Sequence, residues 1–131
     1  MGEHQAAREQ IEQALASDLR QFGPDHPSVA LRRSNLATIL GDLGEHQAAR
    51  EQIEQALASD LRQLGPGHPS VAIRRGNLAV ILSNLGDHQA ALTEIDQALE
   101  IFGNKLPPEH PHIRTAAGSR DTILSRLAAK R

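Results

Sequence analysis

The chain has 131 residues, a length that fits one domain, and no shift of composition along it indicates a second. The chain has 14 Lys and Arg and 16 Asp and Glu, which gives a formal net charge of -2, and positive and negative residues are interspersed along it. Nucleic acid and anionic membranes are therefore poor partners. The absence of cysteine excludes disulfides, thiolate zinc sites and cysteine nucleophiles. No apolar run approaches the roughly 18 residues that span a bilayer, and the N-terminus lacks a signal-peptide stretch, so we expect a cytoplasmic protein.

The chain repeats itself with a period of 42 residues, and units 2–43, 44–85 and 86–127 align without a gap. The third copy has diverged, whereas the first two differ only at positions 22/64, 25/67, 31/73, 34/76, 38/80, 41/83 and 42/84. Phe22 and Phe102 are the only aromatic residues, so the core must be built from small aliphatic side chains, a composition that favours helices.

Each unit begins with a helix, which in the first copy runs from about Glu3 to Gln21. Its apolar stripe has helical spacing, and a Gly followed by Pro then ends it. A second helix is expected from Pro27 to Leu43, because Pro suits the first helical position and Gly44 suits a left-handed helix end. The two predicted apolar stripes consist of Ala7, Ile11, Ala14 and Leu15 in the first helix and of Leu36, Ala37, Leu40 and Leu43 in the second.

The same pattern predicts six helices in all, the last from Pro111 to about Leu127. In that helix Arg120 and Asp121 replace the Leu and Ala of the earlier copies, which suits a C-terminal capping helix over residues 111–127. Antiparallel helix pairs with such short links cannot bury their apolar faces alone. We therefore expect an all-α fold, an α-solenoid of stacked helix pairs forming a single domain over residues 1–131.

The segment HPSVALRRSNLATILGDLGEHQAAREQIEQALASDLRQLG, residues 26–65, resembles a tetratricopeptide repeat (TPR). The 42-residue period and the linker FGPDHPSVA resemble the kinesin-light-chain subclass, and the likeness covers nearly the whole chain. It implies a TPR superhelix with packing positions at Leu36, Ala37, Gly44, Ala49, Ile53 and Ala56. The sequence departs from the family at Arg33 and Arg75, where a large apolar residue is usual, and at His46 and His88, where an aromatic is common, which predicts looser helix packing.

Five of the seven differences between the first two copies lie on one arc of the second helix, spanning about 100°. This arc lies opposite Leu36 and Leu40, so we expect it to face open space. In TPR proteins that side lines a concave groove, and the resemblance implies a peptide-binding or helix-binding groove here. Its three predicted tiers are Leu31, Ser34, Thr38, Gly41 and Asp42; Ile73, Gly76, Val80, Ser83 and Asn84; and Thr115, Gly118, Thr122, Ser125 and Arg126.

The predicted lining is mostly small, uncharged and mildly apolar, which disfavours a highly acidic ligand. Asn35 and Asn77 stand at the edge of the arc, where kinesin-light-chain-like repeats hold the backbone of a bound peptide. They could equally be helix-interior residues bonded to a neighbouring turn. The doublets Arg32-Arg33 and Arg74-Arg75 could form ion pairs with neighbouring helices, the reading we favour, or reach an acidic ligand.

No pattern indicates catalysis, a cofactor or a metal. Six of the seven histidines are repeat equivalents, and no pair within a helix has the i, i+4 spacing that places two imidazoles on one metal. His26 and His68 precede Pro and are expected to help set the helix start. The glycines are helix stops rather than a phosphate-binding loop, and the carboxylates form no pair in an apolar cleft.

Two functions remain. One is a protein-interaction module, with this chain as the C-terminal part of a larger TPR array or signalling protein. The alternative is self-assembly as a homo-oligomer through the first helix, whose Ile11, Ala14 and Leu15 lack the usual preceding helix. Arg outnumbers Lys, which is compatible with a GC-rich bacterial source.

Overall fold

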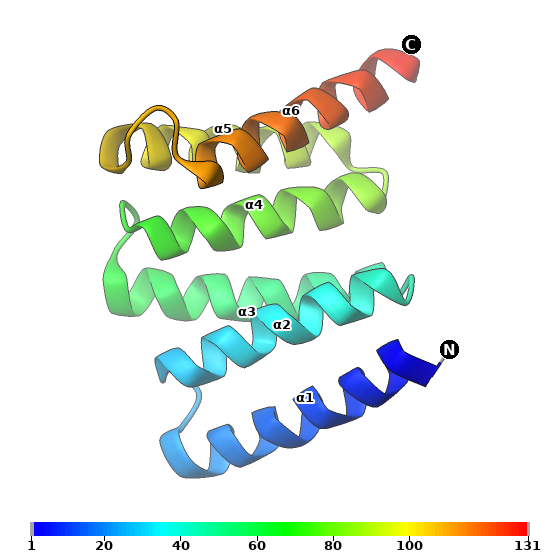
Figure 1. The fold of residues 1–131 in the computed structure, drawn as a ribbon, viewed down its shortest axis with the longest axis vertical. Helices are drawn as coiled ribbons and strands as arrows, with labels where there is room; N and C mark the ends of the chain where they lie inside the picture. Colours follow the sequence, from blue (N-terminus) through cyan, green and yellow to red (C-terminus); the bar gives the residue numbers. More distant parts are fainter. Residues whose placement is uncertain (1, 131) are drawn as a thin grey trace. The chain divides into compact units, whose positions relative to one another are not determined.

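The computed structural model describes residues 2–130, without the side chain of His4, and these residues form six α-helices (Figure 1). They are α1 (Gly2–Phe22), α2 (Pro27–Asp42), α3 (His46–Leu64), α4 (Pro69–Asn84), α5 (His88–Lys105) and α6 (Pro111–Ala129). The prediction of six helices is confirmed. The bounds of α1, α2 and α6 differ from those expected by two residues or fewer.

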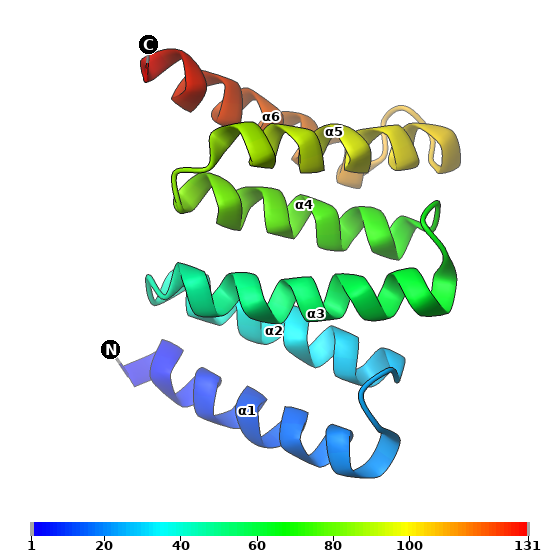
Figure 2. The same cartoon turned by 180° about the vertical axis from the view of Figure 1, so that it is seen from behind.

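The chain divides into two compact units, Met1–Gly65 with α1, α2 and α3, and Pro66–Arg131 with α4, α5 and α6. In the first unit α2 packs against α1 and α3, and in the second α5 packs against α4 and α6 (Figure 2). Helix α6 also contacts α4. Each unit is therefore a stack of antiparallel helices, and α6 takes the place of the second helix of a third copy.

Three helices begin in the same way, at a histidine followed by proline. The backbone N–H of Ser28 donates to Nδ1 of His26 at 3.1 Å, which satisfies one of the donors left open at a helix start. His68 caps α4 and His110 caps α6 with the same geometry. The expectation that His26 and His68 set helix starts is confirmed.

The tight connections between α2 and α3 and between α4 and α5 rest on glycine. Gly44 has φ +82° and Gly86 has φ +90°, the left-handed region that other residues rarely adopt. A side chain at either position would strain the turn that reverses the chain.

The core of each unit consists of small aliphatic residues, as expected. The predicted packing residues Leu36, Ala37 and Leu40 of α2 are buried. So are Ala49 and Ile53 of α3, and the equivalent Ala91 and Ile95 of α5. Close packing of such small side chains lets neighbouring helix backbones approach one another.

Arg32, Arg33 and Arg75 of the two doublets bond to side chains of neighbouring helices, and the ion pairs favoured from the sequence are confirmed for Arg32 and Arg75. Arg32 pairs with Asp18 at 3.1 Å, and Arg75 pairs with Glu94 at 2.9 Å. Arg33 donates to the side-chain oxygen of Gln52 at 2.9 Å. Burial lowers the pKa of the Arg33 guanidinium, which still stays protonated at neutral pH.

The apolar flank of α1 is narrower than predicted. Leu15, expected to be bare, retains only 8% of its exposure because α2 packs against α1, so it is not part of an open surface. Ile11 and Ala14 remain partly exposed, whereas Ile53, the equivalent of Ile11 in α3, is completely buried.

Candidate functional site

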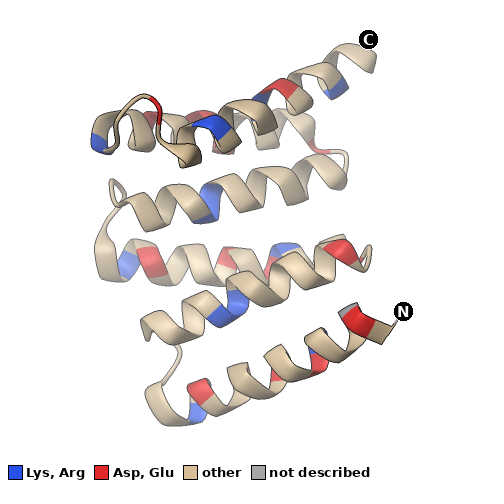
Figure 3. Cartoon of the chain, viewed as in Figure 1, with Lys and Arg blue, Asp and Glu red and all other residues tan. Residues whose placement is uncertain are grey.

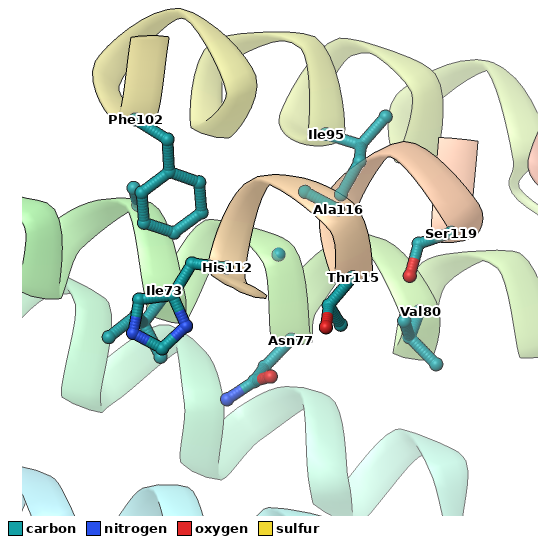
Figure 4. A pocket seen from close by; sticks show the side chains of 11 residues that line it. Ile73, Asn77, Val80, Ile95, Phe102, His112, Thr115, Ala116 and Ser119 are labelled. Atoms are coloured by element: carbon teal, nitrogen blue, oxygen red, sulfur yellow. The ribbon is translucent and has the colours of Figure 1, made fainter. Parts of the chain in front are cut away.

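An apolar pocket of about 140 Å³ lies among α4, α5 and α6, entirely within the second unit. Figure 4 shows Phe102, His112 and Ile73 at one end of this pocket and Val80 and Ser119 at the other. The lining comprises Ala72, Ile73, Gly76, Asn77 and Val80 of α4, Ile95 and Phe102 of α5, and His112, Thr115, Ala116 and Ser119 of α6.

The floor of the pocket is well packed, whereas part of its wall is open. Ile95, Phe102 and Ala116 are buried, while Val80 is 43% exposed at the mouth. The rings of Phe102 and His112 stack with their centroids 5.4 Å apart and an angle of 25° between their planes. The site thus presents a fixed apolar floor and an aromatic end wall to solvent.

A second hollow of about 180 Å³ adjoins the apolar pocket and shares Val80 and Ser119 with it. The side chain of Arg126 reaches from α6 to α4, where Nη1 donates to Oγ of Ser83 at 2.8 Å and to Oδ1 of Asn84 at 3.0 Å. Since Ser83 accepts this bond, its own hydroxyl can donate to Nδ1 of the buried His88, 3.1 Å away. The network joins the end of α6 to the turn between α4 and α5.

Carboxylates are absent from the described lining of both hollows, which takes no Asp or Glu from α4, α5 or α6. Helix α4 contains no acidic residue, and its ribbon carries no red in Figure 3. A neutral or mildly acidic group could approach this surface without repulsion.

The structure brings together the predicted groove residues of the second copy with several of the third. Those that line the two hollows are Ile73, Gly76, Asn77, Val80, Ser83, Asn84, Thr115, Thr122 and Arg126. Gly118 and Ser125 lie on the exposed surface of α6 and line neither hollow. Contact of any of these residues with a ligand stays a prediction.

The predicted residues of the first copy belong to α2, in the other unit. Leu31, Asn35, Thr38 and Asp42 are exposed there, and Gly41 is partly exposed.

The expectation that the whole arc faces open space is wrong for two serines. Ser34 is 5% exposed and Ser83 is 4% exposed. An arc of about 100° is as wide as the apolar stripe of a surface helix, so its edge reaches the packed flank. Ser83 illustrates this, because its hydroxyl lies against His88 of α5.

Sequence reasoning missed the pocket residues Phe102, His112 and Ala116. A signal was present in the third copy, where these positions depart from the Asp, Ser and Arg that both earlier copies carry. The comparison of the first two copies alone could not reveal it. Asn77 lines the pocket and Asn35 is exposed, and contact of either with a peptide backbone stays a prediction.

The described residues contain neither a cluster of metal-ligating side chains nor a helix that could cross a membrane. Across residues 2–130, with the side chain of His4 outside the described set, no three His, Asp or Glu side chains are grouped to hold a metal ion. Among the described helices, none combines the length and apolar content needed to cross a bilayer. The cytoplasmic location and bacterial source stay predictions.

The family model of the tetratricopeptide repeat matches residues 1–62 and 33–104. The chain therefore belongs to the tetratricopeptide repeat family, whose members generally bind protein partners and generally act as non-enzymatic scaffolds. No protein with curated annotation shows significant sequence similarity to it.

Solved structures of kinesin-light-chain-like TPR proteins resemble the chain. A candidate kinesin light chain from Podosopora anserina with nearly identical TPR-like repeats is 28% identical, with a TM-score of 0.69 over 97% of this chain and 65% of that one. A form of the same protein with one residue substituted gives a TM-score of 0.71 at 28% identity, over 98% of this chain and 65% of that one.

BtubC (BKLC) from P. vanneervenii has a TM-score of 0.77 at 22% identity, over 98% of this chain and 58% of that one, a likeness of fold alone. The chain spans less than two thirds of the length of each of these proteins. The all-α TPR fold predicted from the sequence is confirmed.

Proposed function

We propose that the chain is a protein-interaction module that binds a peptide or helix of a partner on the surface formed by α4 and α6 over α5. The observation that carries this proposal is the apolar pocket, which shares Val80 and Ser119 with the second hollow, where Ser83, Asn84 and Arg126 supply polar groups. Recognition sites commonly pair an apolar pocket with a few placed polar groups. A bound segment would lie along both hollows.

The same surface supports binding rather than catalysis. His26, His68 and His110 accept bonds from backbone N–H groups as helix caps, and His88 is hydrogen-bonded to Ser83, so these imidazoles serve the scaffold. The lining of the two hollows holds no carboxylate that could act as a general base beside His112. In this proposal the chain acts within a larger TPR array or signalling protein.

Selection from a random peptide display library tests the proposal. We expect the library to yield peptides that bind the wild-type chain. Their affinity for the Val80→Glu variant should be at least tenfold lower, because the substitution puts a charge at the mouth of the pocket. Val80 is 43% exposed, so the change should leave the fold intact. Affinity would be measured by biolayer interferometry.

Leu64→Glu is the matched control, since Leu64 is a similarly exposed apolar residue at 45% and lies at the end of α3. Peptides that lose affinity equally to both variants, or a library that yields no specific binder, would contradict the proposal.

Self-assembly is the second candidate. Ile11 and Ala14 on α1 remain partly exposed, although their equivalents in α3 are buried. The burial of Leu15 reduces the surface available for it.

A further inference from the structure

The apolar pocket occupies a place where the first copy holds an ion pair. In the first unit, Asp18 of α1 and Arg32 of α2 are joined at 3.1 Å. Two repeats later the equivalent positions are Phe102 of α5 and Ala116 of α6. The second copy keeps the charged residues, as Asp60 and Arg74, so the third copy alone has exchanged both.

This double exchange accounts for the pocket. An arginine at position 116 would extend several methylene groups and a guanidinium from α6, whereas alanine contributes one methyl group. Phe102 replaces the carboxylate with a ring, and both residues are buried in the floor. The space that an arginine side chain would fill is thereby left open and apolar.

The dimensions of the pocket suit one ring. Its volume is about 140 Å³, close to the roughly 150 Å³ of an apolar protein cavity that accepts benzene. Phe102 and His112 already stack, and Ile73 and Val80 supply aliphatic walls. An inserted ring can meet the Phe102 and His112 rings in an offset or edge-to-face arrangement, a contact that aliphatic side chains cannot make.

The absence of charge in the pocket lining restricts the kind of side chain that can bind there. The pocket lining contains no Asp, Glu, Lys or Arg. A charged side chain placed there would lose hydration without gaining an ion pair. The complementary side chain is therefore neutral.

We propose that the apolar pocket holds a neutral aromatic side chain of a partner peptide, and that Phe102 and Ala116 are the residues that create this specificity. The inference rests on the proposed function and names the partner chemistry of the same surface. In the first copy the equivalent positions hold the Asp18–Arg32 ion pair instead.

Titration of the ¹⁵N-labelled chain with N-acetyltryptophanamide tests this inference. The chain contains no tryptophan, so indole fluorescence reports on the probe alone and gives an independent measure of its binding. We expect saturable shifts in ¹H–¹⁵N spectra centred on the amides of Gly76, Phe102 and Ala116. We expect at least tenfold weaker binding of N-acetylleucinamide, which lacks a ring.

Two variants fill the pocket differently. Ala116→Arg should reduce affinity for the probe at least tenfold. The double variant Phe102→Asp with Ala116→Arg should also abolish binding while restoring a pair like that of Asp18 and Arg32, which guards against loss of folding. Circular dichroism would verify the helix content of both, and Leu64→Glu serves as an unaffected control.

Shifts that avoid the pocket, equal binding of the leucine probe, or full binding by folded Ala116→Arg would each overturn the inference. Library peptides that bind through Val80 although the aromatic probe does not would overturn it and leave the proposed function standing. Probe binding with no selectable peptide would instead overturn the proposed function.

Discussion

Gly41 and Ser83 occupy the same repeat position, and each lies five residues before a histidine. Ser83 bonds to Nδ1 of His88, whereas Nδ1 of His46 is buried and has no hydrogen-bond partner among the described residues. A buried nitrogen without a partner costs about 1 to 3 kcal/mol. A Cβ at Gly41 would meet no atom within 4 Å, so the first copy has room for the missing hydroxyl.

We therefore expect Gly41→Ser to stabilise the chain by about 1 to 2 kcal/mol, through a new bond to His46 and a better helix propensity than glycine. This would raise the melting temperature by about 3 to 8 °C in a thermal scan followed by circular dichroism.

Gly41→Ala is the matched control, because alanine has the higher helix propensity but no hydroxyl. Serine must therefore exceed alanine if the hydrogen bond forms. In a His46→Ala background the advantage of serine should vanish. An alanine variant at least as stable as the serine variant would count against the bond.

Single side chains also show where sequence reasoning succeeded and where it stopped. Arg32 and Arg75 form ion pairs as favoured from the sequence, because each lies against a carboxylate of a neighbouring helix. The sequence predicts Ser34 in open space, whereas the structure buries it. The position of a residue on a helical arc predicts the direction of its side chain but not its distance from the neighbouring helix. The burial of small residues at the edge of the arc is therefore predicted poorly.

At the scale of elements, helix bounds were predictable because proline and glycine mark them. Proline stands at the first position of α2, α4 and α6, and left-handed glycines follow α1 and α3. The pocket was harder to predict. It depends on substitutions confined to the third copy and on which three helices meet. The packing of α6 against both α4 and α5 is a tertiary contact that local sequence patterns do not specify.

The C-terminal half of α6 is fastened to the turn between α4 and α5. Arg126 bonds to Ser83 and Asn84, and Nζ of Lys130 donates to the carbonyl of Gly86 at 3.2 Å. The buried residues of α6 are Ala116 and Ile123, so none of the described residues after Ile123 is buried. The last turns therefore depend on polar bonds more than on apolar packing.

We expect Arg126→Ala to speed amide hydrogen exchange about threefold to tenfold in the last two turns of α6, since a bond from a charged donor contributes about 1 kcal/mol or more. The global melting temperature should change little. Mass spectrometry of peptides from residues 119–130 would measure the exchange.

Arg114→Ala on the first half of α6 is the control, and it should leave exchange in the last turns unchanged. Equal exchange rates in the wild type and in Arg126→Ala would mean that the hydrogen bonds of Arg126 do not stabilise the last turns of α6.

At the scale of the whole molecule, the oligomeric state separates the two candidate functions. Of the three α1 residues predicted to join two copies, Leu15 is covered by the α1–α2 packing, and Ile11 and Ala14 are partly exposed. A stable interface generally buries about 800 Å² per partner, which two partly buried side chains cannot supply.

We expect a monomer of 14.2 kDa at all concentrations in size-exclusion chromatography with light scattering. A dimer that Ile11→Asp dissociates and Leu64→Asp does not would establish α1 as an assembly surface instead.

Within each unit, helices contact only helices one or two places away along the chain. Such short-range topology lowers the entropy lost in closing loops and favours fast folding. It also bears on synthesis, because units fold as they leave the ribosome, N-terminal end first. Once Gly65 has emerged from the exit tunnel, all three helices of the first unit are outside the ribosome. The first unit can therefore fold while the helices that line the pocket are still being translated.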